Sequence, residues 1–194
     1  KVSQLNRTYQ DVIDLLTASK MTLTPTIGIT GGAYPLHFAR NPEQLSDIRF
    51  RTLFAPGIVS GLERQAKAIP PAEFETRAAA LRGLGDTTRR VVQGGGVVIA
   101  GTDSPIFPYA MSYHAELEMF AQAGLTPFEV LQTATTRAAE ALGESANLGS
   151  IAAGKLADLV IVTGDPLADI RNARKVRTVI QDGKVYTLQE LLKR

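Results

Sequence analysis

The 194-residue chain contains no cysteine and no tryptophan, and it has only two histidines. The lack of cysteine excludes disulfide bonds and thiolate metal sites. No apolar run approaches the ~20 residues that span a bilayer, and no signal peptide is present, so the sequence predicts no membrane segment. Because the chain opens with Lys1 rather than an initiator methionine, the compartment stays open between cytoplasmic and exported, with a soluble protein expected in both cases.

The chain also lacks a strong charge of either sign. Its 21 Lys and Arg residues nearly balance its 19 Asp and Glu residues, which leaves a net charge of +2. The basic residues are scattered, and the nearest thing to a cluster is Arg171, Arg174, Lys175 and Arg177. No basic stripe is interleaved with aromatic residues, so we expect no nucleic acid as partner; a small-molecule substrate is implied only by the family resemblance described below.

What the chain does have is a buried-strand signal that ends at a carboxylate. Residues 97–101 (VVIAG) form an unbroken apolar run after three glycines, which is typical of a strand buried on both faces. Asp103 follows the carboxyl end of this run, where parallel α/β sheets and barrels place their chemistry. A carboxylate there can bind a metal or hold a proton. The alternative is a cap or turn residue, since Asp favours such positions. A second strand is predicted at 21–27, interrupted by Pro25.

Helical periodicity predicts helices at 9–19, 70–92 and 112–123. Residues 28–70 are punctuated by Gly and Pro without a sustained period, which predicts a long functional loop or short helices that cannot be placed. The clearest boundary is TPFE at 126–129, a capping box with Pro at the first helical position. It predicts one helix ending at Gly143, with a buried stripe of Phe128, Leu131, Ala134, Thr135, Ala138 and Leu142.

From Gly149 onward the pattern changes to short strands. Strands are predicted at 159–162 and 176–181, and Asp182-Gly183 is a strong two-residue hairpin signal that returns the chain through 184–186. A last helical turn or two is expected at 188–192. The organisation is therefore strand–helix units up to about residue 143, followed by a small β-rich appendage.

The two histidines have different expected environments. His114 is predicted in the first turn of the helix after Asp103, where the positive helix end favours a neutral ring able to bind substrate or metal. The alternative is a partly buried His bonded to the loop, and His37 is expected at the surface. Two histidines cannot assemble a His-rich metal site, which needs three or more protein ligands. A nucleophile elbow, a Walker loop and a dinucleotide fingerprint are also absent.

Taken together, these segments resemble the C-terminal part of the amidohydrolase superfamily, on its imidazolonepropionase and prolidase-like side. The strong, collinear part of the resemblance covers residues 97–186, and MTLTPT at 21–26 adds a weaker match to a barrel strand. The motifs that carry it are GTDSP (101–105), HAELE (114–118), AGLTP (123–127), LGSIAAGKLADLV (148–160), GDPL (164–167) and VIQDGKV (179–185).

The resemblance implies an α/β fold, the last two strands and helices of a (β/α)₈ TIM barrel (1–147), with a β-rich tail of a composite β-sandwich subdomain (148–194). It also implies one or two divalent metals, usually zinc, and hydrolysis of amide, cyclic amide or peptide-like C–N bonds by metal-activated water. Asp103 would bind the metal and take the proton of that water, whereas Ser104 and His114 would contact the substrate.

The same resemblance places the metal-binding histidines on earlier barrel strands, which this sequence lacks. We therefore expect a C-terminal fragment whose metal site is absent or incomplete and which is inactive when isolated. Its open strand edges predict a homo-oligomer. Two alternatives remain: a non-catalytic assembly or interaction module with the same fold, and a flavodoxin-like binding domain with several more parallel strands.

Overall fold

The computed structural model describes residues 7–104 and 107–193, so Pro105 of the GTDSP motif lies outside the described residues. Its strands form two separate sheets. In chain order the elements are α1 (Gln10–Ala18), β1 (Thr22–Leu23), η1 (Ile27–Ile29), α2 (Ala33–Arg40), η2 (Pro42–Ser46), α3 (Ile48–Leu53), α4 (Pro56–Lys67), η3 (Pro71–Glu73), α5 (Phe74–Gln93), β2 (Val97–Val98), α6 (Met111–Gln122), α7 (Pro127–Ala134), α8 (Thr136–Ala141), β3 (Leu159–Val162), η4 (Ile170–Arg174), β4 (Val176–Gln181), β5 (Lys184–Thr187) and α9 (Leu188–Leu191).

The first sheet is the predicted parallel pair, β1 and β2, in shortened form. Thr22 lies opposite Val97 and Leu23 opposite Val98, and the Ile99 N–H extends the pairing by donating to the Leu23 carbonyl at 3.0 Å. Both strands are shorter than the predicted 21–27 and 97–101. Pro25 offers no N–H to a ladder, and Thr26 then takes a left-handed conformation with φ 48° that starts the 3₁₀ helix η1.

The segment without a clear sequence period, 28–70, is helical. Its helices α2, α3 and α4 are 8, 6 and 12 residues long, and two 3₁₀ turns separate or precede them. Helices this short span only two or three turns, so their periodicity is hard to detect between Gly and Pro breaks. They still contribute fully buried Tyr34, Phe38 and Phe50 to the core. The additional parallel strands of the flavodoxin-like alternative are not found in this segment.

The predicted capping box is confirmed at the start of α7, where Thr126 and Glu129 exchange both cap hydrogen bonds. The single long helix is wrong, because the chain breaks at Thr135 (φ −135°, ψ −92°) and continues as α8. The buried face also differs from the predicted stripe, already within α7. Phe128 and Leu142 of the predicted stripe are 59% and 73% exposed, and the buried positions are Val130, Thr133 and Ala139.

The second sheet lies in the tail and is antiparallel in the order β3–β4–β5. Asp182 and Gly183 connect β4 to β5 with φ angles of 48° and 75°, the left-handed pair of a type I′ hairpin turn. The predicted hairpin is thus confirmed, and α9 follows it as the predicted last helical turn.

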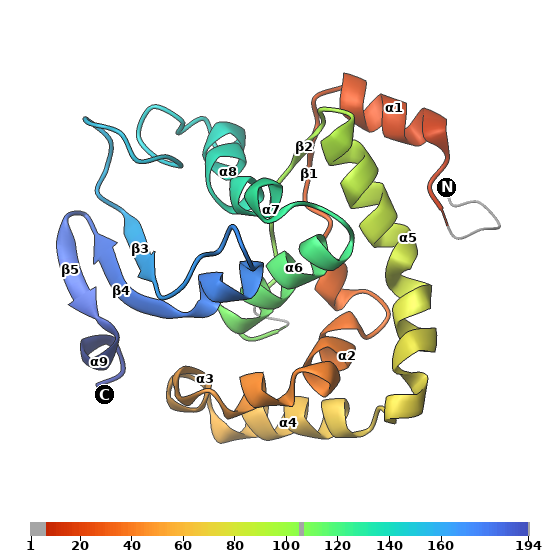
Figure 1. The fold of residues 1–194 in the computed structure, drawn as a ribbon, viewed down its shortest axis with the longest axis horizontal. Helices are drawn as coiled ribbons and strands as arrows, with labels where there is room; N and C mark the ends of the chain where they lie inside the picture. The colour runs from red at the N-terminus through yellow and green to blue at the C-terminus, as the bar shows by residue number, and fades with distance from the viewer. Residues whose placement is uncertain (1–6, 105–106, 194) are drawn as a thin grey trace.

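The hydrophobic core belongs to the helical part of the molecule. Its buried members come from residues 13–130, and the single tail residue among them is Ile170 of η4. Figure 1 shows α6 and α7 at the centre, α1 and α5 along one side, and the β3–β4–β5 sheet on the other. Among the described residues, no helix is long and apolar enough to cross a membrane.

Candidate active site

The carboxyl ends of β1 and β2 meet at one edge of the small parallel sheet, and each is followed by a residue in a left-handed conformation. Thr26 follows β1 with φ 48°, and Asp103 follows β2 with φ 53°. Non-glycine residues rarely adopt this region, and such strain clusters at functional sites. The two segments are in contact, since a Cβ at Gly101 would lie 2.4 Å from Thr24 Cγ2. Only glycine allows this approach.

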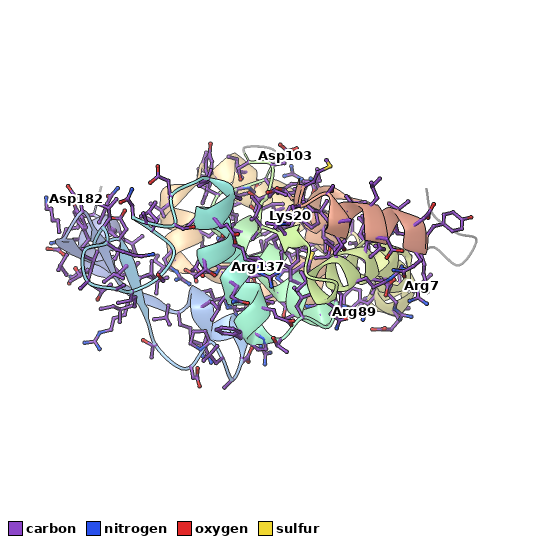
Figure 2. All side chains as sticks on the ribbon, turned by 90° about the horizontal axis from the view of Figure 1, so that it is seen from above. Arg7, Lys20, Arg89, Asp103, Arg137 and Asp182 are labelled. Atoms are coloured by element: carbon purple, nitrogen blue, oxygen red, sulfur yellow. The ribbon has the colours of Figure 1, made fainter. Side chains whose placement is uncertain are left out.

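Asp103 is exposed, and Figure 2 shows it at one edge of the molecule. Its two neighbours point elsewhere, because Thr102 and Ser104 line the larger cavity of the structure and Asp103 does not. The Thr102 and Ser104 hydroxyl oxygens are 2.9 Å apart, and the Ser104 hydroxyl also donates to the Phe107 carbonyl at 3.2 Å. These bonds hold the turn that carries Asp103.

The larger cavity has a volume of about 830 Å³ and lies between the helical part and the tail. Its wall is mostly apolar, with Leu117 from α6, Leu131 from α7 and Leu159 from β3. Ser104 and His114 both line it, so the structure brings these two predicted substrate-contacting residues to one cavity. Asp103 lies between two lining residues in the sequence, but it is not itself part of the cavity wall.

His114 is partly buried in this wall. Burial, helped by the positive charges of Arg49 and Arg174, lowers the pKa of His114 to about 4. The ring is therefore neutral near pH 7, as the sequence predicts. The main cause is desolvation, whereas the sequence argument rested on the positive end of the helix.

A complete metal site is not formed by the residues that the structure describes, because no group of three or more His, Cys, Asp or Glu side chains gathers among them. Asp103 fits the role of one ligand, because it is an exposed carboxylate in the loop that follows the parallel strand β2. The further ligands that a zinc site requires are not supplied by the described part of this chain.

The sequence argument missed Glu116 of α6. Its side chain is fully buried and accepts hydrogen bonds from the backbone N–H groups of Ile27 at 2.7 Å and Gly28 at 2.9 Å. Burial raises the pKa of Glu116 to about 7, although the two N–H bonds act in the opposite direction. A usable signal did exist: apolar residues surround Glu116 on every side of the helix (Ala115, Leu117, Met119, Phe120), a pattern typical of a buried helix.

A second buried polar cluster joins α2, η2, α6 and η4. The expectation of a surface His37 is wrong: the residue is 4% exposed, and its Nε2–H donates to Gln44 Oε1 at 3.2 Å. The Gln44 amide donates to Glu118 Oε2 at 3.4 Å, and Arg174 Nε lies 3.9 Å from Glu118 Oε1. Burial lowers the pKa of His37 to about 4. The flanking Leu36 and Phe38 were the signal for burial.

The comparison with protein families identifies the chain. The model described as "Amidohydrolase family" matches residues 36–186, which is more than half of the chain. The chain therefore belongs to the amidohydrolase family. This agrees with the resemblance inferred from the GTDSP, HAELE and LGSIAAGKLADLV motifs.

Individual relatives are similar over different parts of the chain. Imidazolonepropionase from Symbiobacterium thermophilum is 40% identical over 78 residues, which is 39% of this chain and 18% of that protein. A crystal structure of a Xaa-Pro dipeptidase with bound methionine in its active site has a TM-score of 0.62 and 25% identity, and the match covers 93% of this chain and 38% of that one.

A putative prolidase from Bifidobacterium longum has a TM-score of 0.60 at 24% identity over 93% of this chain and 40% of its own, a level that shows the fold alone. These structures assign the chain to the TIM-barrel type of hydrolase fold, with mixed helix and sheet content. The chain spans no more than about two fifths of the length of these solved relatives.

Proposed function

We propose that the chain is the C-terminal part of a metal-dependent amidohydrolase that hydrolyses a C–N bond of an amide, cyclic amide or peptide-like small molecule. The observation that carries the proposal is Asp103, an exposed carboxylate in the loop that follows the carboxyl end of β2, five residues after Val98. Catalytic residues of TIM-barrel enzymes sit at this end of the strands. The family match over residues 36–186 supports the same reaction class.

In this proposal residues 1–147 are a barrel segment and residues 148–194 are the β-rich tail of a second subdomain. A barrel of this type takes about 250 residues, so in this proposal the remaining strands would lie outside residues 1–194. The match to the Xaa-Pro dipeptidase covers 38% of that chain, which agrees with a partial barrel. The isolated 194-residue chain is expected to be inactive.

Asp103 has two roles in the proposed reaction. It would accept a proton from the attacking water and later return it to the leaving nitrogen, the work of a general base and then a general acid. It would also contribute one ligand to the divalent metal, proposed as zinc, which lowers the pKa of water when bound. The other ligands are expected from residues outside the described part of this chain.

Ser104 and His114 would contact the substrate from the cavity wall. The Ser104 hydroxyl is held by Thr102 and by the Phe107 carbonyl, so its orientation is defined before substrate binds. His114 is neutral near pH 7 and can both donate and accept a hydrogen bond. The largely apolar wall around it suits the uncharged part of a small substrate.

The test is to express the reading frame that contains this chain, load it with zinc, and measure hydrolysis of Xaa-Pro dipeptides and cyclic amides. Asp103→Asn is expected to lower kcat by about 100-fold or more, because general acid–base catalysis contributes that much. Asp14→Asn, an exposed carboxylate of α1, serves as the matched control and keeps wild-type turnover. Wild-type turnover in Asp103→Asn would show that the proposed role is wrong.

A second candidate function is a non-catalytic assembly module, favoured by the uncovered apolar residues of the tail. Val160 and Ile161 of β3 are 58% and 46% exposed, and β3 and β5 are both edge strands of their sheet. Such edges and faces drive association, which also gives the expected homo-oligomer. Light scattering on the 194-residue chain is expected to show dimers or larger species; a monomer at all concentrations would contradict this candidate.

A further inference from the structure

The buried carboxylate of Glu116 links α6 to the segment that follows β1, across 88 and 89 residues of sequence. One oxygen accepts the Ile27 N–H and the other accepts the Gly28 N–H, so both oxygens are used by a single backbone turn. Both residues of that turn are buried. Their N–H groups stand at the start of η1, where no carbonyl within the helix can accept them.

This link reaches the loop of Asp103 through one aromatic ring. The Tyr34 ring lies directly on Gly28, since a Cβ at residue 28 would be 1.9 Å from Tyr34 Cζ. The same ring also packs against Phe107, with 4.6 Å between ring centroids. The Phe107 carbonyl accepts the Ser104 hydroxyl, and Ser104 is the residue after Asp103. Contacts therefore run without a gap from Glu116 to the Asp103 turn.

Two residues of α6 that are only two positions apart face different parts of the candidate site. His114 faces the cavity, whereas Glu116, two residues later, faces the turn after β1. Residues i and i+2 of a helix point to different sides, so one rigid element can position both. Both turns that this helix supports contain a non-glycine residue with positive φ, Thr26 and Asp103. Strained backbone of this kind persists only where surrounding contacts hold it.

We propose that Glu116 is a positioning residue for the candidate active site. It holds the turn after β1 by its two hydrogen bonds and, through the Tyr34 and Phe107 rings, holds the turn that carries Asp103 and Ser104. The proposal rests on the proposed amidohydrolase function for its catalytic consequence. The hydrogen-bond clamp itself can be tested without any activity.

The main experiment compares Glu116→Gln with Glu118→Gln in the metal-loaded protein. Both variants replace one carboxylate oxygen of a buried α6 glutamate by an amide nitrogen. The polar partners of Glu118 are Gln44, His37 and Arg174, none of which belongs to the two turns. A glutamine at 116 offers one acceptor oxygen where two N–H groups need one each. We expect amide hydrogen exchange at Ile27 and Gly28 to become about tenfold faster in Glu116→Gln and to stay unchanged in Glu118→Gln.

The kinetic readout separates positioning from general destabilisation. Glu116→Gln is expected to lower kcat by about tenfold or more with little change in KM, because small misplacement of catalytic groups affects mainly the chemical step. Glu118→Gln is expected to lower the thermal midpoint and leave kcat near the wild-type value. Equal effects of the two variants on exchange and on kcat would overturn the proposal.

A second variant keeps the proposal testable if Glu116→Gln does not fold. Phe107→Ala removes the ring that joins Tyr34 to the Asp103 turn and leaves Glu116 with both of its hydrogen bonds. It is expected to lower kcat while the Ile27 and Gly28 amides stay protected; an unchanged kcat would overturn the link to Asp103. If the wild-type protein hydrolyses no C–N substrate, the proposed function fails, and the exchange comparison still decides whether the clamp exists.

Discussion

The helical part and the tail sheet contain similar apolar residues but differ in how well these residues are covered. Helix α6 is buried around most of its surface, and both Phe120 and Glu116 are fully buried. Strand β3 reads LVIV, yet no residue of it is buried. An apolar run in the sequence therefore predicts a β-strand correctly. It does not predict whether another layer of the fold packs on that strand and buries it.

The two regions meet through η4 rather than through the sheet. Ile170 of η4 is the tail residue that joins the core cluster, and Arg174 at the end of η4 contacts Glu43 at 3.4 Å and Glu118 at 3.9 Å. The Arg174 carbonyl also accepts a hydrogen bond from Arg49. This short 3₁₀ helix is thus one attachment of the sheet to the helical part, and the cavity of about 830 Å³ lies along this junction.

The largest expected effect is on core packing, and it contrasts the two regions directly. Phe120→Ala removes a fully buried ring and is expected to lower the free energy of unfolding by about 3–5 kcal/mol. Val160→Ala, on the exposed face of β3, is expected to cost less than about 0.5 kcal/mol. Urea unfolding followed by circular dichroism at 222 nm measures both. Comparable losses would mean that the tail sheet is covered in solution, for example by a second copy.

An intermediate effect on the free energy of unfolding is expected from a change of pH, because the titrating groups are buried in the helical part. The pKa values of His37 and His114 are both lowered to about 4, so the unfolded chain binds protons near pH 6.5 that the folded chain does not. Stability from these histidines is complete above about pH 6.5 and is lost as pH falls towards 4. For His37 alone the loss is on the order of 3 kcal/mol at most.

Glu116 acts in the opposite direction, because its pKa is raised to about 7. The stability it contributes is complete below about pH 4.5 and is lost as pH rises through 7. Two histidines against one glutamate give a net loss of stability between pH 6.5 and 4. Unfolding curves at pH 7, 5.5 and 4.5 measure this loss. His37→Gln is expected to remove nearly all of it, because His114 and Glu116 then change the stability by similar amounts in opposite directions. An unchanged pH dependence in His37→Gln would contradict the buried position of that ring.

The smallest effect is expected from the two capping boxes, which form a matched pair across the regions. Thr126 and Glu129 cap α7, whereas Thr187 and Glu190 cap the four-residue α9 at the exposed end of the tail. Thr126→Ala is expected to lower the free energy of unfolding by about 1 kcal/mol. Thr187→Ala is expected to increase hydrogen exchange within α9 and to leave the global unfolding midpoint unchanged. A shift of that midpoint equal to the one in Thr126→Ala would show that α9 unfolds together with the core.

Local signals predicted much of the fold. The apolar run at 97–101, the Thr126 capping box and the Asp182-Gly183 turn each depend on residues within a few positions of one another, and each is found as predicted in type. The exact strand lengths and the break at Thr135 were not predictable in this way. They depend on the donor lost at Pro25 and on how α7 and α8 pack against the rest of the chain.

The candidate site divides in the same manner. Its sequence positions, Asp103 after a strand and His114 at the start of the next helix, could be predicted because strand and helix ends have recognisable residue patterns. The partners of the buried Glu116 and Glu118 could not, because their hydrogen bonds are made across 74 to 89 residues. A charged residue in an apolar helix carries no local sign of which distant amide or arginine will satisfy it.

By itself, the sequence determined the family motifs, the parallel strand pair, the hairpin and the position of one carboxylate at a strand end, since hydrophobic periodicity and turn chemistry are local properties. Only the tertiary structure decided that Asp103 stands beside the cavity wall rather than in it, and that α6 buries two glutamates. Burial and desolvation depend on contacts between segments far apart in the chain, and these exist only once the chain is folded.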